Sequence, residues 1–300
     1  MQATTPVESG VRHLSVPVYT SLALTFSFLW STGFIAVAFA LRSSPPLFLM
    51  GLRFVLSGGV LLLIVIFLRR SLPRTLRDWL RLGVLGILSF AFFFGFTATA
   101  LQGITAGTGA VLASTNPLML AFAAPFLLGE RLGLQKFFGL GLAFISVVFL
   151  MSARMGTGES PFHMALVLVA NVSMVTGTIL FKRWALPYDL AGMNAIQLLV
   201  GGVALLIPSF LWEPVGQVIW DTNFIVALIY MCIMLSWVTM LLYLFLVRHG
   251  DASRANTFLF LTPVFGLVLG ALLLGDPLRP IDALGATGVA VGIWLVMRSR

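Results

Sequence analysis

The segment AVLASTNPLMLAFAAPFLLGE, residues 110–130, returns 146 residues later as NTFLFLTPVFGLVLGALLLGD, residues 256–276. Both copies carry a proline near the middle, Pro117 and Pro263, and both end in Leu-Leu-Gly followed by an acidic residue. The same offset aligns residues 106–151 with 252–297 without a gap, and an offset of 144 relates the earlier part of each half. We therefore interpret the chain as an internal duplication.

Apolar stretches of membrane-spanning length fill the rest of the chain. A hydrocarbon core about 30 Å thick is crossed by roughly 20 helical residues. Charged residues make up 9% of the chain and the mean hydropathy is +1.05, whereas soluble domains carry about 25% charged residues. We predict an all-α membrane protein whose ten transmembrane helices lie at residues 18–41, 46–68, 78–101, 105–128, 134–153, 161–182, 190–211, 222–247, 253–274 and 280–298.

Each half of the duplication holds five of these spans. Because five is odd, the second half must enter the membrane from the opposite side, which predicts two inverted five-helix repeats. We place them at residues 18–153 and 161–298, after an N-terminal tail at residues 1–17. Inverted repeats of this kind are typical of transporters, in which the substrate site lies near the midplane between the repeats. A duplicated membrane scaffold without transport is the alternative.

Lys and Arg are distributed unevenly between the two sides of the membrane. With the N-terminus in the cytoplasm, fourteen of the 18 basic residues fall inside, three fall outside (Arg42, Arg154 and Arg279), and Arg53 lies within a span. The positive-inside rule therefore predicts that both termini are cytoplasmic. The first apolar stretch is too long for a signal peptide and is predicted to be an uncleaved helix. Since the positive charge sits in short turns, nucleic acid is not an expected partner.

The spans lack several kinds of side chain, and this argues against several functions. All ten acidic residues and all three histidines fall in loops or at helix ends. Acid–base catalysis needs such groups at a site, so we do not expect an enzyme, a metal site or a cofactor. The single cysteine, Cys232, excludes an intramolecular disulfide. A channel would need rings of carbonyls or charges, and neither is visible, so a channel or receptor-like subunit is a weaker alternative.

Several short sequences resemble those of a known superfamily. They are FLWSTGF at 28–34, LRF at 52–54, STNP at 114–117 and LGER at 128–131, echoed by LTP at 261–263 and LGD at 274–276. They resemble the drug/metabolite transporter superfamily, in its ten-helix branch with paired EamA-type repeats. The chain is also similar to bacterial aromatic amino-acid exporters of that branch. This similarity implies a bacterial inner-membrane protein that exports aromatic and other neutral amino acids by alternating access.

The resemblance leaves other cargoes open, since one fold serves many substrates. Organic cations are possible substrates in addition to amino acids. The alternative function is that of a flippase or carrier for drugs, lipids or nucleotide-sugars. Small multidrug exporters of the superfamily rely on a buried acid, which this chain lacks, so we expect transport without obligate proton coupling. The expected partners are a small-molecule substrate and membrane lipid, and the protein is expected to act as a monomer.

Arg53 is the one formal charge within a predicted span. It lies about 10 Å below the outer end of its helix, at about 1.5 Å per residue. A guanidinium matches a substrate carboxylate well, although it could instead snorkel outward or brace the repeats. Gln197 occupies the equivalent position of the second repeat under the offset of 144. Both residues are predicted to bind substrate.

Further candidates are polar or aromatic groups within the spans. Pro117 should free the carbonyl of Ala113 and kink its helix, and Pro263 should act in the same way, so both are candidate hinges. Trp30, Trp237 and Tyr243 would suit an aromatic substrate by stacking. Amides and hydroxyls complete the predicted substrate-binding set, although each could equally bond helix to helix: Ser31, Thr97, Asn116, Asn171, Thr176, Thr239 and Asn256.

Overall fold

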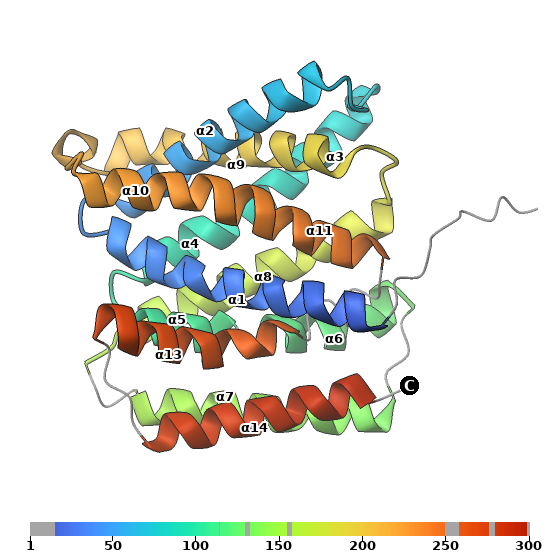
Figure 1. The fold of residues 1–300 in the computed structure, drawn as a ribbon, viewed down its shortest axis with the longest axis vertical. Coiled ribbons are helices and arrows are strands. Elements are labelled where there is room, and N and C mark those ends of the chain that lie inside the picture. The colour runs from blue at the N-terminus through green and yellow to red at the C-terminus, as the bar shows by residue number, and fades with distance from the viewer. Residues whose placement is uncertain are drawn as a thin grey trace, which may run out of the picture.

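The computed structural model describes residues 16–113, 115–129, 133–154, 158–249, 258–275 and 280–298. These residues form helical segments joined by short turns, and the long helices run side by side (Figure 1). Ten segments are present, and their ends agree with the predicted spans to within two residues wherever the structure describes both. The chain is therefore an all-α membrane protein with ten transmembrane segments.

The first repeat contains five of these segments. Its third segment includes a π-helix, η1, and its fourth is split into two short helices. In chain order the elements are α1 (Val16–Ala40), α2 (Pro46–Phe67), α3 (Leu76–Gly86), η1 (Ile87–Phe92), α4 (Phe93–Ala100), α5 (Ala106–Ala113), α6 (Asn116–Leu127) and α7 (Leu134–Arg154).

The second repeat has the same plan. Its third segment again contains a π-helix, η3, and a 3₁₀ turn, η4, precedes the main helix of its fourth segment. The elements are α8 (Pro161–Trp184), α9 (Leu190–Trp212), η2 (Val215–Gln217), α10 (Thr222–Tyr230), η3 (Met231–Thr239), α11 (Met240–His249), η4 (Phe258–Leu261), α13 (Thr262–Leu274) and α14 (Pro280–Arg298).

Length and hydropathy support a membrane location. Six described segments are continuous and apolar enough to cross a bilayer. These are the first three segments of each repeat. The others contain shorter apolar helices, among them Asn116–Leu127 and Leu134–Ser146. Many large apolar side chains of these helices are exposed, whereas Arg53, Asn171 and Asn194 are buried.

The helices of the two repeats pack on one another in a pseudo-two-fold arrangement. The most extensive contacts join α2 to α9 and α7 to α14, which are the second and fifth helices of each repeat (Figure 1). The first helix of each repeat packs on the third segment of the other, α1 on α10, η3 and α11, and α8 on η1 and α4. The same set of contacts results when the repeats are exchanged, as expected for inverted repeats.

Glycines let α2 and α9 approach closely at two equivalent points. A Cβ added at Gly58 would lie 2.9 Å from the nitrogen of Leu199, and one at Gly202 would lie 2.8 Å from the nitrogen of Val55. Both the glycines and their neighbours differ by 144 in number. Small residues permit such contact between membrane helices, where packing drives association. The crossing is thus fixed by sequence in both repeats.

The two π-helices are also equivalent, because η1 begins at residue 87 and η3 at residue 231. In η3 the wider turn leaves the carbonyl of Met234 to accept a hydrogen bond from Thr239 Oγ1, at 2.7 Å. π-Helical turns inside α-helices occur frequently at functional sites. Nothing in the hydropathy pattern predicted these turns, because their residues are as apolar as the rest of the spans.

Each proline lies in the first turn of an α-helix, after a break between α5 and α6 in the first repeat and after the 3₁₀ turn η4 in the second. The structure ends α5 at Ala113 and begins α6 at Asn116, with Pro117 in its first turn. In the other repeat α13 begins at Thr262, with a proline in its first turn. The expectation of a kink is therefore corrected: proline takes the first-turn position, where its missing N–H is not needed.

Each break is fastened by the first helix of the opposite repeat. Asn171 of α8 donates to the carbonyl of Leu112, at 2.9 Å. Ser27 of α1 donates to the carbonyl of Phe258, at 2.7 Å. The donors differ by 144 and the acceptors by 146, so these are the same bond in the two repeats. Backbone groups freed by a break are thereby satisfied inside the membrane.

Candidate functional site

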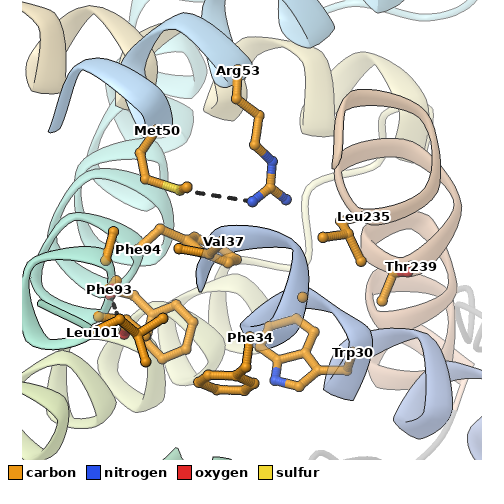
Figure 2. Close-up of a pocket in the computed structure, with 13 residues that line it drawn as sticks. Trp30, Phe34, Val37, Met50, Arg53, Phe93, Phe94, Leu101, Leu235 and Thr239 are labelled. Atoms are coloured by element: carbon orange, nitrogen blue, oxygen red, sulfur yellow. Dashed lines mark hydrogen bonds between the residues drawn. The ribbon is translucent and has the colours of Figure 1, made fainter. Parts of the chain in front are cut away.

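A cavity of about 40 Å³ lies between the repeats near the middle of the bundle (Figure 2). α1, α2 and the third segment of the first repeat form most of its wall, and η3 of the second repeat closes it. It is lined by Trp30, Gly33, Phe34, Val37, Met50, Arg53, Phe93, Phe94, Thr97, Ala98, Leu101, Leu235 and Thr239. A water needs about 10–15 Å³ of such space, and ligand sites typically have about 300–1,000 Å³. The cavity is therefore contracted.

Arg53 enters this cavity from α2 and is only 2% exposed. Its Nε donates to Ser236 Oγ at 3.0 Å, and its Nη1 lies 3.7 Å from the sulfur of Met50 (Figure 2). The guanidinium carbon is 4.9 Å from the ring centre of Phe54 and 5.3 Å from that of Phe94. Cation–π contacts of this kind stabilise a desolvated cation. Arg53 thus points inward and does not snorkel to the surface.

No carboxylate neutralises Arg53 in the part of the chain that the structure describes. The ion pair present there joins Arg81 to Asp78, near the beginning of α3. Removing a charge from water costs several kcal/mol when no counter-ion accompanies it. The rings and the Ser236 hydroxyl offset only part of that cost. An anionic group placed beside the guanidinium would offset the rest of that cost.

Aromatic rings form the wall across the cavity from Arg53. Trp30 lies 6.0 Å from both Phe93 and Phe94, between ring centres, and 5.5 Å from Phe26. Figure 2 shows Trp30 and Phe34 side by side below the guanidinium. Tilted aromatic contacts at these distances are favourable beyond their buried area. The wall offers an apolar aromatic surface to a ligand side chain.

Two hydroxyls provide acceptors in the same cavity. Thr97 Oγ1 donates to the carbonyl of Phe93 at 2.7 Å, and Thr239 Oγ1 donates to Met234. Since each donor is used within its own helix, the hydroxyl oxygens keep lone pairs for a ligand N–H. One charged donor, an aromatic wall and two acceptors therefore surround a single small space.

Gln197 and Tyr243 line a separate space of about 10 Å³ in the other half of the bundle. Tyr243 is hydrogen-bonded to Thr178 through the two hydroxyls, 2.6 Å apart, and Gln197 Nε2 donates to the carbonyl of Met193 at 3.1 Å. The Tyr243 ring lies 6.2 Å from Trp30. This ring contact links Tyr243 to the wall of the main cavity, which neither Gln197 nor Tyr243 lines.

Trp237 lies away from the cavity. Its Nε1 donates to the carbonyl of Ser57 at 2.9 Å, and its ring lines an apolar surface groove between α2 and the third segment of the second repeat. The indole therefore braces η3 against α2. Ser236, its neighbour, instead faces inward and holds Arg53.

The other predicted polar residues lie away from the cavity, and of these Asn171 bonds a neighbouring helix. Ser31 is buried and donates to Phe28 within α1, and Asn171 holds the α5–α6 break. Asn116 is 3% exposed, and its Oδ1 has no hydrogen-bond partner among the described residues. Thr176 is exposed on α8 and donates to Val172. None of the four lines the cavity.

Two of the predicted site residues receive little or no structural description. Asn256 lies outside the described residues. Pro263 lies in the first turn of α13, but its side chain is outside the part described. Pro117 is buried at the beginning of α6. Four predicted residues therefore meet at the cavity: Trp30, Arg53, Thr97 and Thr239.

Sequence reasoning missed most of the apolar lining and one important amide. Phe93, Phe94 and Leu101 lie on one face of the third segment with Thr97, at helical spacing, but the many phenylalanines there obscured that face. Asn194 Nδ2 donates to the carbonyl of Ser236 at 2.8 Å. This amide supports the residue that holds Arg53, and its position within a span was a signal that could have been used.

Comparison with known proteins agrees with the fold. Residues 18–152 and 162–298 each match the EamA-like transporter family. The chain is similar to the uncharacterized transporter YvbV of Bacillus subtilis, with 30% identity over 280 residues that cover 92% of each protein. It is also similar to the uncharacterized inner membrane transporter YedA of Escherichia coli K12, with 27% identity over 92% of this chain and 89% of that protein.

Two further matches extend this picture. The WAT1-related protein At3g02690, chloroplastic, of Arabidopsis thaliana is 29% identical over 90% of this chain and 67% of its own length. A solved crystal structure superimposes with a TM-score of 0.76 at 20% identity, over 94% of this chain and 98% of the other. This last match supports the fold alone.

The fold and the central cavity define a multi-pass membrane transporter built from two repeats. The chain belongs to the EamA-like transporter family, within the drug/metabolite transporter superfamily.

Proposed function

We propose that this transporter exports aromatic and other neutral amino acids across the bacterial inner membrane. The observation that supports this proposal is the buried Arg53, which faces an aromatic wall without a carboxylate partner in the described chain. A substrate carboxylate would bind the guanidinium, because planar forks match carboxylates in two hydrogen bonds. The ammonium group would donate to Thr97 and Thr239, and the side chain would lie on Trp30.

Alternating access would provide the space that the contracted cavity lacks. Equivalent π-helices, equivalent breaks and equivalent bonds across the breaks give each repeat the same set of joints. Exchange of the two repeat conformations would then open the cavity to one side and close the other. We propose Pro117 and Pro263 as hinges, because each lies where a fourth segment restarts after its break.

Proton coupling is not part of this proposal. Every carboxylate and imidazole of the sequence falls in a loop or at a helix end, so no group of ordinary pKa near neutrality is available at the cavity. Transport would then be driven by the substrate gradient, with a monomer as the working unit and no cofactor.

Counterflow in proteoliposomes tests the proposal. Purified protein is reconstituted with unlabelled phenylalanine inside, and uptake of labelled phenylalanine, leucine and lysine is followed without a pH gradient. We expect phenylalanine and leucine to accumulate more than lysine, because the buried guanidinium of Arg53 would repel the additional positive charge of the lysine side chain. Absence of counterflow for every neutral amino acid would contradict the proposal, and a strict requirement for a proton gradient would contradict its energetics.

A further inference from the structure

A second and larger hollow, of about 600 Å³, lies on the outside of the bundle. It is formed by the end of α1, the beginning of α10 and the end of α13, which lie together in Figure 1. Its volume falls within the about 300–1,000 Å³ typical of ligand sites. We call it the α1–α10–α13 groove.

The groove is apolar along most of its length and open to the surroundings of the bundle. Ile35, Phe39, Val226 and Leu269 line it, and Leu273 at its edge is 57% exposed. These side chains belong to membrane-spanning segments. In a bilayer the hollow therefore faces hydrocarbon, and an acyl chain is the natural occupant of its apolar part.

Opposite charges lie at one end of the groove, where α1 and α10 meet. Arg42 and Asp221 both line it, but they do not form an ion pair with each other; the ion pair of the described chain is Arg81–Asp78. The Arg42 guanidinium carbon lies 4.9 Å from the ring centre of Phe39. An unpaired cation and anion at the mouth of one hollow match a ligand that carries both charges.

The carboxylate is held in place by the local structure. Asp221 Oδ1 accepts from the nitrogen of Phe224 at 2.7 Å as the cap of α10, and Oδ2 lies 3.4 Å from Ser43 Oγ. The nitrogen of Ile219 donates to the carbonyl of Ser43 at 2.9 Å. These bonds fix the two ends of the groove mouth relative to each other and so preorganise its charges.

The groove is separate from the central cavity. Thr32 Oγ1 and the Tyr230 hydroxyl lie 2.7 Å apart in a hydrogen bond at its floor. Next to Thr32 in the chain, Gly33 lines the cavity instead, and a Cβ added to it would lie 3.4 Å from the side chain of Leu235, which also lines the cavity. A ligand in the groove therefore approaches from the lipid and not from the transport path.

We propose that the α1–α10–α13 groove binds one phospholipid with a zwitterionic amine headgroup, phosphatidylethanolamine. Its phosphate binds Arg42, its ammonium binds Asp221, and an acyl chain follows the apolar floor. Charge complementarity favours this lipid over an anionic one, whose headgroup would leave Asp221 beside a phosphate. The primary ammonium favours it over phosphatidylcholine, whose methylated amine cannot donate a hydrogen bond to the carboxylate.

Native mass spectrometry of the purified full-length protein tests this inference. The delipidated protein is titrated separately with phosphatidylethanolamine, phosphatidylglycerol and phosphatidylcholine. We expect one tightly bound phosphatidylethanolamine, and we expect Arg42→Gln to weaken its binding about tenfold, because it removes charge-assisted bonds to phosphate. Asp221→Asn keeps a good helix cap and should abolish the preference over phosphatidylcholine. Ala227→Trp, which fills the floor, should prevent binding with both charges intact.

Arg77→Ala is the control, because this exposed arginine lies near the beginning of α3 and does not line the groove. It should leave the titrations unchanged. The proposal would be overturned if the wild type bound the three lipids with equal affinity and Arg42→Gln bound them with that same affinity. It would also be overturned if millimolar phenylalanine displaced the bound lipid from the wild type and did so less well from Asp221→Asn, since the groove would then be an amino-acid site.

Discussion

The central cavity and the smaller space beside Gln197 occupy equivalent places in the two repeats, yet they differ in size and chemistry. The first has about 40 Å³ and the second about 10 Å³. At an offset of 144, Arg53 is replaced by Gln197 and Trp30 by Met174. The backbone is thus duplicated while the charge and the large ring are not. Two equivalent scaffolds thus contain one charged site, at Arg53.

The replacement Arg53→Gln removes the difference in charge between the two spaces and should have the largest effect. Loss of a charge-assisted hydrogen bond, at about 1.5–3 kcal/mol, should raise the KM for phenylalanine counterflow about 10- to 100-fold. The thermal unfolding midpoint should stay the same or rise, because an unneutralised buried charge is removed. Gln197→Ala is the matched control, with a change of less than about threefold expected, since no charged contact is lost.

Transport close to that of the wild type in Arg53→Gln would contradict the substrate-binding role. A lowered unfolding midpoint combined with unchanged KM would assign Arg53 to bracing of the helices.

The glycine contacts between α2 and α9 test whether the repeats are equivalent in energy as well as in geometry. Gly58→Ala and Gly202→Ala should each lower the free energy of unfolding by about 1–3 kcal/mol, because the new methyl group meets backbone atoms that cannot move aside. Gly59→Ala has open space around it and should be neutral or stabilising by roughly 0.5–1 kcal/mol. Thermal unfolding of the three variants in detergent gives the comparison.

Unequal losses at Gly58 and Gly202 would show that the crossing is borne mainly by one repeat. A loss at Gly59 as large as at Gly58 would refute the close approach altogether.

The bonds across the two helix breaks offer a further comparison. Asn171→Leu removes the amide that donates to the Leu112 carbonyl and to the Thr115 hydroxyl and should destabilise the protein by about 1–3 kcal/mol. Ser27→Ala removes one such bond and should lose about 1 kcal/mol. Thr176→Val, on the exposed face, is the control and should change the unfolding midpoint little. If Thr176→Val reduced transport while Asn171→Leu did not, the placement of both residues would be contradicted.

Of the two tryptophans, Trp30 lines the cavity and Trp237 supports the helices around it. Their replacement should have the smallest effects on transport and stability. Trp30→Ala should lower phenylalanine counterflow about 3- to 10-fold more than leucine counterflow, because an aromatic pair contributes about 0.5–1.5 kcal/mol. Trp237→Phe should keep substrate preference and lower stability by about 1 kcal/mol, through its lost bond to Ser57. Counterflow with both substrates and thermal unfolding distinguish the roles. A change of substrate preference in Trp237→Phe would indicate that Trp237 contacts the substrate, contrary to this assignment.

Sequence alone determined the membrane class, the ten segments and the duplication. These depend on local hydropathy and on an offset between two similar strings, and both can be read along the chain without knowing any neighbour. The sequence also indicated Arg53 as a candidate site residue, since a single charged side chain within a membrane span is usually functional.

Only the tertiary structure decided which polar residues meet. Thr176 and Thr178 are two positions apart on α8, yet the first is exposed and the second is hydrogen-bonded to Tyr243. Each residue turns an α-helix by about 100°, and in lipid both faces of a span are apolar, so hydropathy does not reveal the inward face. The π-helical turns shift that face again within η1 and η3. The packing of one repeat on the other therefore selected Trp30 and Thr97 for the cavity and left Trp237 outside it.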